Sequence, residues 1–180
     1  SQAKNIQGRH LVANKRPYKL PVPITRDANV LEQGVKMELI KGCIEQHKLM
    51  LPRYEYLENL YLGFHDIFRL PEKEGWKPDH RLAVGFPRYI TDTFIGYAYG
   101  KPIKVQSEDE KFDEAMQLFA KRNALKDHNK EMAKVACKFG HAFEYLYQNE
   151  STETRVTRFT PRQMFIVYDD SVAERALFAV

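Results

Sequence analysis

The residues best suited to chemistry are Tyr168, Asp169 and Asp170, which stand between two apolar segments near the end of the sequence. Palm-type polymerases place two metal-binding aspartates in a hairpin turn of this kind, so the triplet raises the hypothesis of a metal-dependent nucleotidyl transferase. Such an enzyme needs a third carboxylate on a neighbouring strand, and no upstream strand offers an aspartate between apolar neighbours. Because aspartate favours turns in any protein, we interpret the triplet as a turn and keep the enzyme as the alternative.

Other catalytic or metal-binding patterns are missing from the sequence. The nine glycines form no phosphate-binding loop, and the six histidines have no metal-ligand spacing. Cys43 and Cys137 each lie among apolar residues at helical spacing, and we expect both to be reduced core residues. The sequence therefore predicts neither an enzyme nor a bound cofactor or metal ion.

Aromatic side chains alternate along one predicted strand, where Phe143, Tyr145 and Tyr147 share a face. Such a stripe can stack bases in an RNA-binding sheet, and it can equally be ordinary core. Glu144 and the acidic or neutral residues 148–153 beside it disfavour a nucleic-acid platform, because phosphate contacts need basic side chains.

The basic charge is confined to the first 26 residues. They hold six basic residues and no acidic one, which leaves 22 basic against 24 acidic residues in the remainder of a chain whose net charge is +4. Three prolines disfavour a helix there, so residues 1–26 are predicted to form a basic extended arm. We take Lys15, Arg16 and Lys19 as candidate contacts to nucleic acid or to an acidic partner; the alternatives are a basic-armed DNA-binding module and a solvated tail.

The clearest pattern of elements runs from residue 125 to the end. A helix is predicted over 125–139 because apolar residues recur at helical spacing, and Gly140 ends it. Strands follow at 143–147, 154–159, 165–168 and 175–180, with turns between them. The last strand is still apolar where the sequence stops, so we expect the 180 residues to be part of a longer chain.

Earlier elements are mainly helical. Asn29 and Glu32 form a capping-box pattern that predicts a helix to about Met50, and Pro52 opens a second helix that runs to Gly63. A loop is predicted over 64–78. Pro87 opens a third helix, in which Ile90, Phe94 and Tyr97 share a face. A short strand is predicted over 103–105, and a capping box of Ser107 and Glu110 begins a fourth helix that ends near Asn123.

These elements predict an α+β fold in which amphipathic helices pack on a small, mainly antiparallel sheet. With 43% hydrophobic residues, the chain can build one sizeable core or two small ones that share an interface. No stretch approaches the roughly 20 apolar residues of a membrane span and no signal peptide opens the chain, so we expect no membrane partner.

Two long segments resemble a known family. The first is residues 81–103, RLAVGFPRYITDTFIGYAYGKPI, and the second is residues 129–147, NKEMAKVACKFGHAFEYLY. The second continues through PRQMFIVYDD at 161–170 and into the strand that begins at Arg175. In type, order and spacing these segments are similar to those of tailed-bacteriophage portal proteins from siphophages of Gram-positive hosts, and together they cover most of residues 30–180.

The resemblance implies a structural role. Portal subunits assemble into a ring, typically a dodecamer, at one capsid vertex, and DNA passes through the ring during packaging and ejection. The resemblance also implies partners: the large terminase subunit, a head-to-tail adaptor, scaffold and the major capsid protein. It places the protein in the virion and, during assembly, in the host cytoplasm. Residues 27–180 would form a wing-like region that is cut off before the stem, clip and crown.

Overall fold

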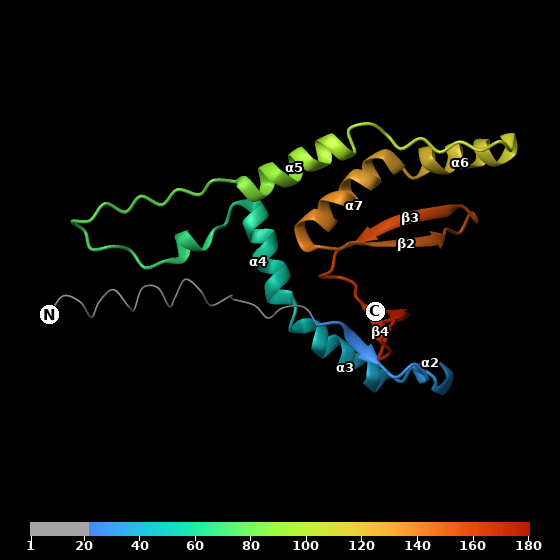
Figure 1. Ribbon diagram of the computed structural model, residues 1–180, viewed down its shortest axis with the longest axis horizontal. Helices are drawn as coiled ribbons and strands as arrows, with labels where there is room; N and C mark the ends of the chain where they lie inside the picture. Colours follow the sequence, from blue (N-terminus) through green and yellow to red (C-terminus); the bar gives the residue numbers. More distant parts are fainter. Residues whose placement is uncertain (1–21) are drawn as a thin grey trace. The chain divides into compact units, whose positions relative to one another are not determined.

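The computed structural model describes residues 22–180, whose helices and strands are drawn in Figure 1. In chain order the elements are β1 (Ile24–Arg26), α2 (Val30–Gln33), α3 (Met37–Lys48), α4 (Leu51–Leu62), the 3-10 helix η2 (Asp66–Arg69), α5 (Phe86–Ala98), α6 (Glu110–Arg122), α7 (Leu125–Phe139), β2 (Phe143–Gln148), β3 (Thr154–Phe159), β4 (Ile166–Asp169) and β5 (Ala176–Ala179). The predicted α+β class is confirmed, and two of the three strand pairings are antiparallel.

The described chain divides into two compact units. One contains the described residues up to Arg53 together with Ile166–Val180, and the other contains Tyr54–Phe165. The first unit holds a three-stranded sheet in the order β1-β4-β5, and the second holds the β2-β3 hairpin. Each sheet is therefore small, and each needs helices to cover its apolar side chains.

The core of the first unit forms where the β1-β4-β5 sheet meets α3. β1 lies parallel to β4, with Ile24 opposite Val167, and β5 runs antiparallel to β4. Val167 on β4 and Cys43 on α3 are fully buried, and α3 contacts β1. The last residues of the predicted arm are thus extended, and they complete a sheet with strands from the far end of the chain.

The single helix predicted from Asn29 to Met50 is wrong. Gly34 has φ +81°, outside the right-handed helical region, and it separates the short α2 from α3. Asn29 makes no side-chain capping bond; its backbone N–H instead donates to Oδ1 of Asp27 at 2.8 Å. The apolar spacing of the sequence continued through the glycine and concealed this break.

The second unit is organised on α7, which packs against α5, α6 and β3. Its buried residues include Val135 and Phe139, and the Phe139 ring meets the Tyr54 ring of α4 edge to face with centroids 5.9 Å apart. Gly140 ends α7 at φ +92°, and its N–H donates to the carbonyl of Ala136 at 2.8 Å. The predicted helix over 125–139 is confirmed, as is the hairpin that follows it.

α6 and α7 are separated by only Asn123 and Ala124. Ala124 has φ +46°, in the left-handed region that glycine favours and alanine seldom occupies. Neither residue is a helix breaker, so the local sequence does not itself demand a corner here. The corner must therefore be held by contacts made elsewhere.

Three further predictions in this unit are wrong. The N-cap of α6 is Asp109, whose side chain accepts hydrogen bonds from the backbone N–H groups of Lys111 and Phe112, and Ser107 lies outside the helix. Residues 103–105 form no strand, because they run beside α6 rather than beside another strand. Cys137 is exposed on α7, because it lies outside the buried face of the helix that includes Ala133, Val135 and Phe139.

The face of α5 marked by Ile90, Phe94 and Tyr97 is exposed, and Tyr97 is 92% accessible. Ile95 is the residue of α5 that points into the core, at 6% accessibility. The helical spacing was read correctly, but within the described chain this stripe has no cover.

Candidate interaction surfaces

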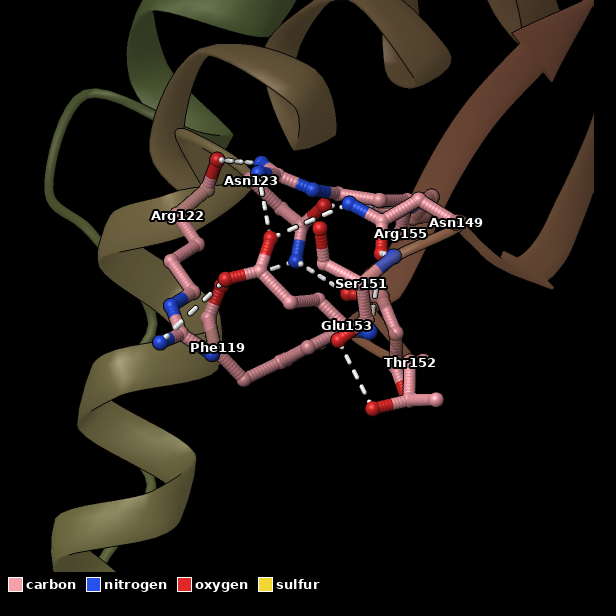
Figure 2. A network of polar contacts seen from close by, with 10 residues as sticks. Phe119, Arg122, Asn123, Asn149, Ser151, Thr152, Glu153 and Arg155 are labelled. Carbon is pink, nitrogen blue, oxygen red and sulfur yellow. Dashed lines mark hydrogen bonds and ion pairs between the residues drawn. The ribbon is translucent and has the colours of Figure 1, made fainter.

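Asn123 joins the α6–α7 corner to the outer edge of the hairpin (Figure 2). Its side-chain Nδ2 donates to the carbonyl of Thr154 at 3.2 Å, and its Oδ1 accepts from the backbone N–H of Val156 at 3.1 Å. These are the two groups that a neighbouring strand would otherwise bond, so one side chain takes the place of a strand along part of β3. Nδ2 also donates to the carbonyl of Phe119, one of the carbonyl groups in the last turn of α6.

At the same junction, Glu153 pairs with two arginines. Arg155 of β3 donates to its Oε2 at 2.8 Å, and Arg122 of α6 lies 3.3 Å from its Oε1. Asn149 donates to Oε2 as well, and the hydrogen bonds from Asn149 and Arg155 hold the pKa of Glu153 below its ordinary value. Arg155 also donates to the carbonyl of Arg122 at 2.8 Å. Helix end, hairpin turn and strand are thus tied by one network, which Figure 2 shows.

A second polar contact lies between α7 and the hairpin. His128 is buried on α7, and its Nε2 lies 2.8 Å from Oε1 of Glu144 on β2. The buried imidazole is therefore satisfied by its neighbour, as a structural histidine is. The carboxylates and guanidinium groups in these contacts are paired with one another, so the arrangement serves to position the hairpin.

Tyr168 and Asp169 are the last two residues of β4, and Asp170 begins the turn that leads to β5. Asp169 is buried, and its Oδ1 accepts from the hydroxyl of Ser171 and from the backbone N–H of Arg175, each at 2.8 Å. The Ser171 hydrogen bond is the main reason that the pKa of Asp169 is lowered. Within residues 22–180 no group of three or more His, Cys, Asp or Glu side chains is arranged to hold a metal ion. This geometry favours the turn over the nucleotidyl-transferase interpretation.

The remaining candidate residues, Lys15, Arg16 and Lys19, lie outside the described residues. Sequence reasoning missed Asn123, which it treated only as the end of a helix. Asparagine is common at helix ends, and its second role depends on a hairpin that lies 31 residues further along the chain. No local pattern carries that information.

Exposed apolar side chains are the most prominent feature of the described surface. Among residues 22–180, ten hydrophobic residues and Pro161 are buried, whereas 26 large hydrophobic residues are exposed. They include the α5 stripe and the hairpin residues Tyr145 and Leu146, whose side chains lie on opposite faces of β2. Large exposed apolar surface marks sites of protein contact, so a surface of this composition favours a chain that is covered by partners.

No helix among the described residues has the length and apolar character needed to cross a bilayer. Comparison with protein-family models gives a match over residues 40–180 to the model described as "Phage portal protein, SPP1 Gp6-like". No curated protein matches the chain.

Proposed function

The chain belongs to the phage portal protein family, a family of structural proteins, and from this premise we propose that it is one subunit of a ring at a capsid vertex. The ring serves as part of the conduit for DNA packaging and ejection and as the head-to-tail connection of the virion. The observation that carries the proposal is the family match over residues 40–180.

The exposed apolar surface supports this function. A ring subunit presents two different patches, each of which meets the complementary patch of a neighbour, and both remain uncovered in a single copy. The exposed apolar side chains of the described chain are suited to such contacts. The paired network at the α6–α7 corner supports the rigidity without which a head-to-tail contact does not close into a ring.

Several finer statements belong to the same proposal. The ring is a dodecamer whose partners are the large terminase subunit, a head-to-tail adaptor, scaffold and the major capsid protein, with double-stranded DNA passing through it. Residues 27–180 are a wing-like domain and residues 1–26 an arm that contacts nucleic acid or an acidic partner through Lys15, Arg16 and Lys19. The protein assembles in the host cytoplasm and remains in the virion, and it catalyses no reaction.

The test is the assembly state of the intact protein. We expect light scattering and negative-stain electron microscopy to find closed rings of identical copies with a central opening. A protein that stays monomeric under every assembly condition contradicts the proposal. For the arm, replacement of Lys15, Arg16 and Lys19 by serine should weaken salt-dependent DNA affinity while rings still form, because it leaves β1 in place. Unchanged affinity would show that the arm does not contact DNA.

A further inference from the structure

A groove of about 530 Å³ lies at the α6–α7 corner. The segment before α6 runs back along this helix (Figure 1) and contributes residues 102–106 to the lining of the groove. Its apolar lining includes Ile103, Val105, Met116 and Leu125. Its charged lining consists of three lysines, Lys104, Lys121 and Lys126, and it contains no acidic residue. The groove is therefore lined by apolar and by positively charged side chains.

The three lysines converge from different segments. Lys104 precedes α6, Lys121 lies in its last turn and Lys126 lies in the first turn of α7. Each is exposed, and none has a carboxylate partner within 4.0 Å in the part of the chain that the structure describes. A positive site without its own counter-charge is matched by an acidic partner.

The opposite end of α6 has the complementary composition. Residues 107–114 hold five acidic side chains and one lysine. Asp109 and Asp113 are used within the helix, as the N-cap and as the acceptor for Gln117. Glu108, Glu110 and Glu114 are exposed and, among residues 22–180, have no cationic partner. Phe112 stands among them, 53% accessible, as an exposed apolar anchor.

One chain cannot bring its own two ends together. α6 rises about 1.5 Å per residue, which places Glu110 and Lys121 roughly 16 Å apart along one rigid helix. The helix dipole accounts for an acid in the first turn and a lysine in the last. It does not account for Lys104 and Lys126, which lie outside α6, or for the exposed Phe112.

We propose that the groove at the α6–α7 corner of one copy receives the acidic start of α6 from the next copy, with Phe112 against the apolar lining residues and the glutamates against the three lysines. The contact joins two different patches, so it repeats head to tail from copy to copy, as ring closure requires. This interface rests on the proposed ring function and identifies one place where neighbouring subunits meet.

Charge reversal in the intact protein tests the interface. We expect Lys121→Glu with Lys126→Glu to raise the protein concentration needed for ring assembly by at least about tenfold, and Glu110→Lys with Glu114→Lys to do the same, because each places like charges together. All four changes combined should restore assembly. The matched control is Lys36→Glu with Lys41→Glu, two exposed lysines of the other unit, which should assemble normally.

Zero-length carbodiimide cross-linking of wild-type rings, mixed from light and heavy isotope-labelled copies, gives a readout that needs no variant. We expect cross-links between the glutamates of residues 108–114 in one copy and Lys104, Lys121 or Lys126 in another. If rings form without these cross-links, or if the charge-reversed variants assemble like wild type, the proposed interface is wrong and the proposed ring function still stands. The proposed interface is also wrong if the lysine variant loses DNA affinity while the glutamate variant assembles normally. That result would assign the groove to nucleic acid. A wild-type protein that forms no ring overturns both proposals.

Discussion

Asn123 and Val156 are joined by a hydrogen bond in which the side-chain oxygen of Asn123 accepts from the backbone N–H of Val156 at 3.1 Å. The same side chain donates to the carbonyl of Thr154, so it satisfies a donor and an acceptor on one edge of β3. Through this pair of bonds, a single side chain fixes the position of a hairpin against a helix corner whose backbone is strained at Ala124.

Replacement of Asn123 by alanine should loosen the hairpin edge. The Val156 amide loses its acceptor, and a broken hydrogen bond of this kind costs about 1–3 kcal/mol. Amide hydrogen exchange should therefore report faster exchange at Val156, by about tenfold or more. Asn129→Ala on α7, which removes an asparagine that makes no side-chain hydrogen bond with the described residues, is the control. Equal exchange rates in wild type and Asn123→Ala would show that the bond does not hold the hairpin.

Replacement of Ala124 by glycine should stabilise the α6–α7 corner by about 0.5–1 kcal/mol. Glycine adopts φ +46° without the steric cost that alanine bears there, and this relief exceeds the entropy that glycine loses on folding. Ala115→Gly, within the regular part of α6, should instead destabilise by about 1 kcal/mol. Amide exchange along α6 and α7 measures both. If Ala124→Gly accelerates amide exchange as much as Ala115→Gly does, the backbone at Ala124 is not strained.

Acid should weaken the junction through Glu153. Its pKa in the folded protein is below the ordinary value of 4.5, so the carboxylate stabilises the fold fully above that pH, and the contribution is lost as the pH falls through the folded pKa. Exchange of the Glu153 and Val156 amides, corrected for the intrinsic effect of pH, should accelerate on acidification below pH 4.5. In Glu153→Gln this acceleration should be smaller. An identical pH response in the variant would exclude Glu153 as the titrating group.

The β4–β5 turn should depend on Asp169 as an acceptor and not as a metal ligand. Asp169→Asn keeps an oxygen that can accept from Ser171 and from the backbone of Arg175, so exchange of the Arg175 amide should change little. Asp169→Ala removes that oxygen and should accelerate the exchange. Added Mg²⁺ should leave the melting temperature of both variants and of the wild type unchanged. A Mg²⁺-dependent rise in the wild type that is lost in Asp169→Asn, with Asp170 also replaced by Asn, would restore the nucleotidyl-transferase interpretation.

Sequence reasoning was most successful where a local signal and the tertiary structure agree. α7 and its hairpin were predicted because the apolar period changes from helical to alternating at Gly140, where the backbone does turn. It failed where an apolar period continues through a conformational break, as at Gly34, and where an apolar stripe stays exposed, as on α5. The contact of Asn123 with the edge of β3 could not be predicted from the local sequence, because that edge is formed by residues far along the chain.

The parallel pairing of β1 with β4 also determines when the first unit can fold during translation. Ile24 leaves the ribosome long before its partner Val167, which is translated roughly 140 residues later. At about 5–20 residues per second, that interval lasts on the order of 7–28 seconds. During this time the nascent β1 has no strand to join, so the first unit folds only after the second has emerged whole between its two halves.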